Sequence, residues 1–220
     1  MLAKMKAILR SKGYKLFVRP YELNIVGIRS KNTKANRFDD ELHVFYKVKP
    51  LKWEYHVFKV TTDPGTYWLE NPIEPKGTAI LAQGQYLNAY HIGMHQGKYK
   101  ALVQQKPVNV IRDYDRNAWL DFLNGNKESG LFGINIHRAM AMGNTKYIDR
   151  FSAGCQVFEN ATDFQHFLQL CDKHSGLYGN QFTYTLIDFR AIRRESLKRI
   201  AMGALTLGAG IIGYMNYDHD

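Results

Sequence analysis

The sequence has few cysteines, and this scarcity excludes a fold built on disulfides. Only Cys155 and Cys171 occur among the 220 residues, so free thiols are expected, although a single bridge between them is possible. The chain also lacks an export signal at its start. MLAKMKAILRSKGYKLF is basic but has no apolar run and no small-residue cleavage site, and we therefore expect no N-terminal signal peptide.

Signatures of metal binding and of nucleic-acid binding are equally scarce. The only metal-like spacing is His91-x-x-x-His95, and the neighbouring Gly93 and Gly97 disfavour the helix that such a pair requires. Zinc-finger spacing and aromatic RNA-binding motifs are missing. We expect no metal, no cofactor and no nucleic-acid partner.

What the sequence has is a globular composition with a basic excess. Apolar residues make up 45% and aromatic residues 13%, enough for a packed core. The 30 Lys and Arg against 20 Asp and Glu give a formal net charge of +10. That charge attracts anionic partners such as acidic lipid, nucleic acid or cell-wall polymer, without choosing among them.

The order of segments predicts one mainly β domain with a few helices. We divide the chain into a basic lead (1–20), a domain (21–190) and a basic flank with an apolar segment (191–220). Expected strands include ELNIVGIRS, LHVFYKVK, WEYHVFKVTT, ALVQQ, VNVIR, GINIH and FTYTLIDF, which are rich in β-branched and aromatic residues. NATDFQHFLQLCDKH has helical spacing and places Cys171 on the apolar face, in the core.

The segment from 200 to 215, IAMGALTLGAGIIGYM, carries no charge. It is slightly shorter than a usual membrane helix of about 17 to 25 residues. Small residues at four-residue spacing, Ala204 with Gly208 and Ala209 with Gly213, are typical of helices that approach closely in membranes. A C-terminal membrane helix and an apolar helix packed on the domain are both consistent with this pattern.

The segment from 136 to 158, IHRAMAMGNTKYIDRFSAGCQVF, holds the residues with reactive chemistry. A thiol attacks as its thiolate, and a nearby imidazole can take the proton and return it to a leaving amine. Cys155 and His137 supply this pair. Gly154 lets backbone N–H groups face a developing oxyanion, and Ser152 is expected to orient the imidazole.

These residues resemble the catalytic motif of the L,D-transpeptidases of the YkuD type, in which a histidine is followed by Ser-x-Gly-Cys. The segment Asp63-Pro64-Gly65-Thr66-Tyr67 is similar to the family's Thr-Pro-x-Gly-x-Phe. GINIHRA together with SAGCQVF resembles a divergent, phage-associated branch. The resemblance covers about residues 42–189 and implies a β-sandwich-like fold.

Two departures from the family motif affect substrate binding. Arg138 stands where the family has glycine, and Gln156-Val157-Phe158 replaces its hydrophobic-x-Arg ending. The arginine that would contact the substrate carboxylate is therefore missing, and Arg138 or Arg150 is expected to replace it. Tyr90 and Tyr99 are expected to line the substrate groove.

The resemblance implies acyl transfer on peptidoglycan stem peptides through a thioester on Cys155. An amine acceptor would give an L,D-transpeptidase, and water would give an L,D-carboxypeptidase or endopeptidase; the motif residues are common to both. The alternative is a non-catalytic cell-wall-binding envelope or virion component that retains the fold. Either function places the protein in the cell envelope or at a membrane.

Overall fold

The structure is a computed structural model that describes residues 1–122 and 125–189. It is mainly β, as the sequence predicts. Its three helices are α1 (Leu2–Ser11), α2 (Thr66–Glu70) and α3 (Ala161–Tyr178). Its strands are β1 (Asn24–Arg29), β2 (Asp40–Lys49), β3 (Lys52–Thr61), β4 (Thr78–Leu81), β5 (Gly84–His95), β6 (Tyr99–Gln104), β7 (Val108–Asp113), β8 (Lys127–Gly130), β9 (Ile136–Arg138), β10 (Gln156–Phe158) and β11 (Phe182–Asp188).

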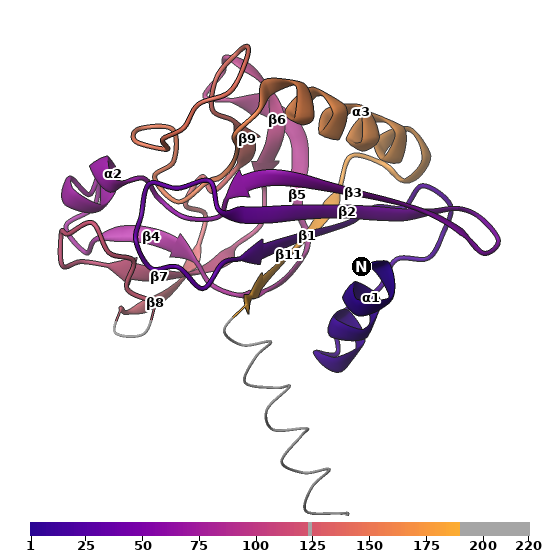
Figure 1. Ribbon diagram of the computed structural model, residues 1–220, viewed down its shortest axis with the longest axis horizontal. Helices are drawn as coiled ribbons and strands as arrows, with labels where there is room; N and C mark the ends of the chain where they lie inside the picture. The colour runs from indigo at the N-terminus through magenta and orange to yellow at the C-terminus, as the bar shows by residue number, and fades with distance from the viewer. Residues whose placement is uncertain (123–124, 190–220) are drawn as a thin grey trace, which may run out of the picture.

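Eight strands close into a barrel in the order β1-β11-β5-β6-β9-β10-β3-β2. The other three, β4, β7 and β8, form a small antiparallel sheet beside it (Figure 1). Two neighbouring pairs in the barrel are parallel, β1 with β11 and β9 with β10. The β9–β10 pair is joined by a long connection over residues 139–155, which we call the crossover loop.

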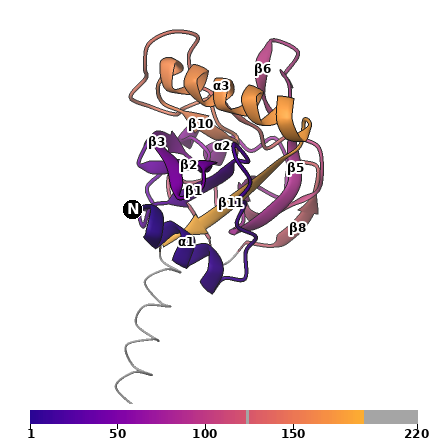
Figure 2. The same ribbon diagram turned by 90° about the vertical axis from the view of Figure 1, so that its right-hand side faces the viewer.

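Alternation along the strands builds the barrel core. In β2, Leu42, Val44 and Tyr46 point into the barrel. Phe45, which lies between Val44 and Tyr46, points outward and packs against α1. Helix α3 lies across one end of the barrel (Figure 2) and inserts Phe164 and Phe167 into the same core. Cys171 follows on that face and is fully buried, which confirms its predicted place in the core.

The helix predicted near Asn160 is present as α3. Asn160 is its N-cap, and its side-chain oxygen accepts hydrogen bonds from the N–H groups of Thr162 and Asp163. The basic lead, in contrast, contains a helix that the sequence analysis did not predict. In α1, Met5 and Leu9 pack on the outside of the barrel against Val26, Phe45 and Ile187.

None of the helices within residues 1–122 and 125–189 combines the length and apolar character needed to cross a bilayer. The basic flank and the apolar segment, residues 191–220 with the expected helix at 200–215, lie outside the described residues.

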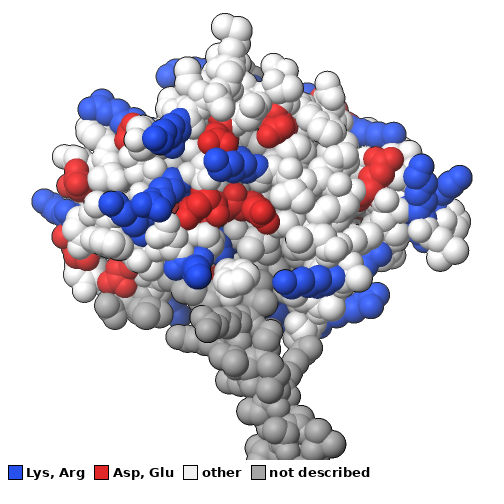
Figure 3. Space-filling model, viewed as in Figure 1, with Lys and Arg blue, Asp and Glu red and all other residues white. Residues whose placement is uncertain are grey.

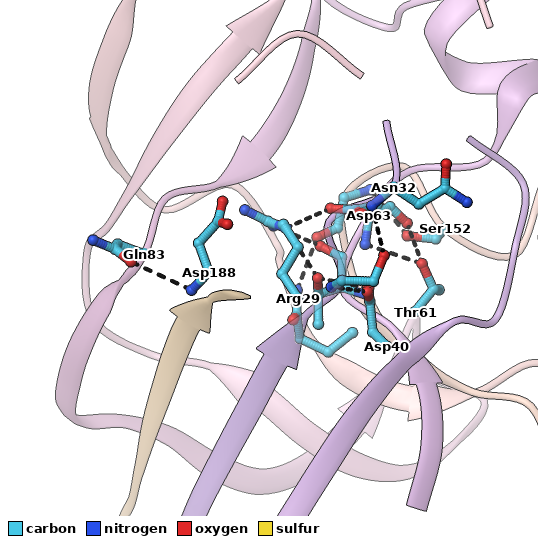
Figure 4. A network of polar contacts seen from close by, with 12 residues as sticks. Arg29, Asn32, Asp40, Thr61, Asp63, Gln83, Ser152 and Asp188 are labelled. Carbon is cyan, nitrogen blue, oxygen red and sulfur yellow. Dashed lines mark hydrogen bonds and ion pairs between the residues drawn. The ribbon is translucent and has the colours of Figure 1, made fainter. Parts of the chain in front are cut away.

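A buried polar network joins β1, β2 and the end of β3 (Figure 4). Arg29 Nε lies 2.7 Å from Asp63 Oδ1, and its guanidinium also donates to Thr62 Oγ1 and the Thr62 carbonyl. Asp40 accepts from Thr62 N–H at 2.6 Å and from Ser30 N–H at 2.7 Å. Burial, and next the charge of Asp63, raises the pKa of Asp40 to about 7.

Replacing Arg29 with Met is expected to lower the free energy of unfolding by about 3–5 kcal/mol, because it leaves Asp63 buried without its counter-charge. Urea denaturation measures the change. Lys59→Met is the matched control, since Lys59 is exposed and its pair with Glu159 at 3.0 Å is expected to contribute less than about 1 kcal/mol. Equal losses in the two variants would contradict a structural role for the buried pair.

Candidate active site

The parallel pairing of β9 and β10 brings His137 and Cys155 to one face of the barrel wall. Ile136 pairs with Gln156, and His137 with Val157. Side chains alternate along a strand, so Cys155, just before β10, projects to the same side as Val157 and His137. With strands about 4.8 Å apart and a rise of about 3.3 Å per residue, the two Cα positions are about 8 Å apart, within reach of a thiol and an imidazole.

The Cys155 thiol has two backbone partners in the segment before β9. Its Sγ donates to the Gly133 carbonyl and accepts from the Asn135 N–H, each at 3.4 Å. The side chain is partly exposed and packs against the cluster formed by Phe38, Ile148 and Val157. Ile148 belongs to the crossover loop, which therefore forms part of the thiol's surroundings.

The His137 ring is held by its Nδ1 atom. Nδ1 lies 2.8 Å from the carbonyl oxygen of Arg138 and 3.1 Å from the hydroxyl of Tyr99, which itself donates to the same carbonyl. A carbonyl can only accept, so the neutral ring carries its proton on Nδ1. Nε2 is then the basic nitrogen, and it is buried with no hydrogen-bond partner among the described residues. This nitrogen is therefore open to accept a proton.

A second histidine lies flat against the first. The rings of His95 and His137 stack with centroids 4.0 Å apart at 22°. Asn135 fixes the orientation of His95: its Oδ1 accepts from the Gln104 N–H, so its Nδ2 faces His95 Nδ1 at 3.0 Å. His95 Nδ1 therefore accepts, and its Nε2 bears the proton.

Electrostatics keep both reactive groups neutral at rest. Burial, and next the neighbouring His95, lowers the pKa of His137 to about 3. Burial raises the pKa of Cys155 to about 11, although the Asn135 N–H has a smaller opposite effect. Between these two values the site holds a neutral thiol and a neutral imidazole. Proton transfer must then accompany attack on a substrate.

The turn before Cys155 is held by Ser152, in a different way from the one expected. Ser152 Oγ donates to the Cys155 carbonyl at 2.8 Å and accepts from the Gly154 N–H at 3.2 Å. It makes no hydrogen bond to His137 within the described part of the chain, so the expectation that Ser152 orients the imidazole is wrong. The Arg138 carbonyl and the Tyr99 hydroxyl do so instead.

Gly154 is required by sterics. Its φ is +123°, and a Cβ on it would lie 2.1 Å from the Ala79 carbonyl oxygen. Its own N–H is bonded to Ser152 Oγ, and so this N–H group does not face an oxyanion in this conformation. The described residues provide no acceptor for the Cys155 N–H, and this group can therefore donate to a developing oxyanion.

The Asp63-Pro64-Gly65 segment lies directly against this turn. Gly65 N–H donates to the Ser152 carbonyl at 2.9 Å, and a Cβ on Gly65 would lie 2.0 Å from the Asp149 carbonyl oxygen. The buried Arg29–Asp63 pair fixes the start of the same segment, and Figure 4 shows Ser152 beside it. Two segments far apart in sequence therefore meet at the turn before Cys155.

A cavity of about 250 Å³ adjoins the turn on the side of the small sheet. Ala153 from the turn and Leu131 and Phe132, which precede Gly133, form part of its lining. The rest is contributed by Trp68, Ile73, Glu74, Gly77, Thr78, Ala79 and Arg112. In the parts of the chain that the structure describes, no group of three His, Cys, Asp or Glu side chains is placed to hold a metal ion.

The four residues expected to bind substrate have different environments. Arg138 stacks on the Tyr99 ring at 4.2 Å and Arg150 on the Tyr67 ring at 3.9 Å, and neither forms an ion pair with a described carboxylate. Tyr99 is half-buried and positions His137. Tyr90 is fully buried in the barrel, packed on Tyr184 at 5.8 Å. The expectation that Tyr90 lines a groove is wrong, because alternation along β5 turns it inward.

Sequence reasoning did not identify His95 and Asn135. Asn135 stands two residues before His137, a spacing that places both on one face of an extended segment. His95 ends β5 and reaches His137 through the tight β5–β6 turn, where Gln96 and Gly97 have positive φ. The sequence His-Gln-Gly-Lys-Tyr, which indicates a hairpin turn after His95, is the signal that could have placed His95 at the site. The spacing of His95 from His91 does not give this information.

Gly154→Ala is expected to lower the unfolding free energy by more than about 2 kcal/mol, because the new Cβ meets backbone at a positive φ. Gly176→Ala in α3 is the matched control: open space surrounds that position, and the change is expected to stabilise the protein by about 0.5–1 kcal/mol. Thermal unfolding of the two variants provides the comparison. A neutral Gly154→Ala would show that the turn is not constrained by Ala79.

The alkylation rate of Cys155 is expected to rise about tenfold per pH unit between about pH 7 and pH 10, because a pKa raised to about 11 leaves the thiol protonated throughout that range. The Cys171→Ser background isolates the reaction, and mass spectrometry with iodoacetamide measures it. His137→Ala should show the same slope. A plateau near neutral pH that disappears in His137→Ala would instead indicate a preformed thiolate–imidazolium pair.

Comparison with family models, with curated proteins and with solved structures finds no match to this chain. The residues of the chain itself supply the features that bear on its chemistry. These are a thiol on the same face of the barrel wall as an imidazole whose Nε2 has no partner among the described residues, a glycine turn held against Ala79, and an adjoining cavity.

Proposed function

We propose that this protein is a cysteine-dependent acyl transferase of the L,D-transpeptidase type that acts on peptidoglycan stem peptides. One observation carries the proposal: on the face that β9 and β10 share with Cys155, His137 Nδ1 is anchored to a backbone carbonyl, while Nε2 is buried without a hydrogen-bond partner among the described residues. A structural histidine in a core usually has both ring nitrogens satisfied. A base that must accept a proton from a thiol needs one nitrogen open.

The first chemical step forms a thioester. Cys155 Sγ attacks the substrate carbonyl carbon while its proton passes to His137 Nε2. The Cys155 N–H faces the oxygen on which negative charge develops. Collapse of the tetrahedral intermediate breaks the C–N bond, and His137 returns the proton to the departing amine.

The second step releases the acyl group. An acceptor amine or a water molecule attacks the thioester carbonyl and gives its proton to His137 Nε2. The C–S bond then breaks, and the proton returns to the Cys155 sulfur. An amine yields a cross-link and water yields a hydrolysed stem. Both products come from the same two residues.

The motif and the surroundings of Cys155 support the proposed substrate class. The cavity beside Ala153 can take a peptide side chain. Arg138 and Arg150 each lie on an aromatic ring without an acidic partner among the described residues, so their guanidinium groups can meet a stem-peptide carboxylate. The same proposal includes a location in the cell envelope and a fold related to the β-sandwich of the L,D-transpeptidases.

A non-catalytic wall-binding role is the second candidate, and one observation favours it. The shifted pKa values of Cys155 and His137 leave both groups neutral at rest, as in a protein that retains the fold without turnover. Such a protein would bind the wall through its basic surface. The two candidates differ in whether wall fragments change on contact.

Incubation with purified muropeptides, followed by mass analysis, is expected to show cross-linked or trimmed products. Cys155→Ala should abolish them, and His137→Ala should lower the rate by about a hundredfold to ten-thousandfold, the usual contribution of general acid–base catalysis. Cys171→Ser, which changes the thiol buried in the core, is the matched control and should retain turnover. Wall binding without product in the unmodified protein would favour the binding role.

A β-lactam of the carbapenem class reports the nucleophile in the same experiment. Its strained lactam is expected to acylate Cys155 in the unmodified protein and in Cys171→Ser. Peptide mapping locates the added mass. An adduct on Cys171, or full turnover by Cys155→Ala, would contradict the mechanism.

A further inference from the structure

A basic surface forms where α1 lies beside the β2–β3 hairpin. Helix α1 packs on the barrel through Met5 and Leu9, and Lys6 Nζ lies 3.4 Å from the centre of the Trp53 ring of β3. The basic helix–hairpin surface consists of Lys4, Lys6 and Arg10 of α1 with Lys47, Lys49 and Lys52 of the hairpin. Figure 3 shows Lys and Arg side chains at this end of the molecule, to the right and below, with Asp and Glu further inward.

The charges of this surface are not neutralised by the protein. Residues 1–21 contain no Asp or Glu, and within the described chain none of the six basic side chains forms an ion pair with a carboxylate. Burial, and next the charges of Arg10 and Lys47, lowers the pKa of Lys6. Helix and hairpin therefore lie within each other's electric field. A surface of this kind attracts an extended anion.

The tip of the hairpin adds an apolar group. Leu51 is 98% exposed and sits at φ +64° in the turn, directly between the paired Lys49 and Lys52. The hairpin projects beyond the rest of the barrel (Figure 1). A leucine at a projecting tip with lysines on both sides has nothing within the described chain to bury it.

We propose that the basic helix–hairpin surface docks on an anionic lipid bilayer, with Leu51 entering the headgroup layer. Anionic headgroups spread over a plane can meet lysines from both elements at once, and the acyl boundary beneath them can bury Leu51. A nucleic acid or another soluble polyanion would neutralise the lysines but leave Leu51 in water. The lipid surface is the partner that satisfies both features.

Docking in this way would leave the Cys155 site accessible. The crossover loop lies at the top of the molecule and α1 at the bottom in both views (Figures 1 and 2). The inference is independent of the proposed chemistry, because none of its residues contributes to the site around Cys155 and His137. It also differs from the segment at 200–215, which lies outside the described residues.

The test is sedimentation of the full chain with vesicles of phosphatidylcholine alone and of phosphatidylcholine mixed with phosphatidylglycerol. Binding is expected only with the anionic lipid and should weaken as salt rises. The double variant Lys49→Glu/Lys52→Glu should weaken it by at least about twentyfold, since each charge near the surface changes partitioning by roughly fivefold. Leu51→Ser should weaken it severalfold with no change in charge.

The matched control is Lys31→Glu/Lys106→Glu, which changes net charge equally at two exposed lysines outside the surface; it should weaken binding by less than about threefold, through long-range repulsion alone. Equal losses in both double variants would overturn the proposal in favour of net charge. Strong binding to phosphatidylcholine alone, unchanged by the hairpin variants, would overturn it in favour of an apolar segment elsewhere. Heparin binding with the same lysine dependence, together with an unaffected Leu51→Ser on vesicles, would overturn the choice of lipid.

Discussion

The candidate site depends on the parallel pairing of two three-residue strands, β9 and β10. That register turns Ile136 and Phe158 into the barrel core and leaves His137 and Val157 on the opposite face. A slip by one residue would reverse every side chain and bury the imidazole in the core. So short a pairing contributes little by itself, and it is held by its neighbours β6 and β3 within the closed sheet.

Polar contacts inside the barrel secure the same register. Gln156 points inward, where its Oε1 accepts from the Tyr184 hydroxyl at 2.7 Å and its Nε2 donates to the Gly154 carbonyl at 3.3 Å. Its position is where the motif of the L,D-transpeptidases has a hydrophobic residue. In this chain the residue after Cys155 therefore connects the turn to β11. On the other side, the Arg29–Asp63 pair fixes the segment that Gly65 attaches to Ser152.

Much of the fold could be predicted from local pattern, because alternation and capping are local properties. The strands from β1 to β3, the strand β11 and the helix after Asn160 all follow from them. Closure into a barrel could not be predicted, since it depends on pairings such as β1 with β11 that are distant in sequence. Helix α1 could not be predicted with the same ease, because Lys and Arg interrupt the apolar residues of the basic lead; Met5 and Leu9 nevertheless pack it on the barrel.

The residues of the candidate site also divide into those that a local motif predicts and those that depend on distant contacts. Cys155, His137 and Gly154 could be found because their chemistry and spacing form a motif. Ser152 could be identified as a residue of the turn, but its hydrogen bond to the Cys155 carbonyl could not be predicted, because a hydroxyl can bond to any polar group nearby. His95 depends on a hairpin that folds back over a strand from another part of the chain.

The parallel pairing of β1 with β11, which closes the barrel, has a consequence for how the protein folds during synthesis. β11 is the last strand of the described chain and lies between β1 and β5, so the sheet has two open edges until residues 182–188 have left the ribosome. Exposed edges favour pairing with other chains, and contacts between distant segments form slowly. Folding is thus delayed until synthesis of the barrel is nearly finished, and a nascent chain stalled before β11 is a natural client for chaperones.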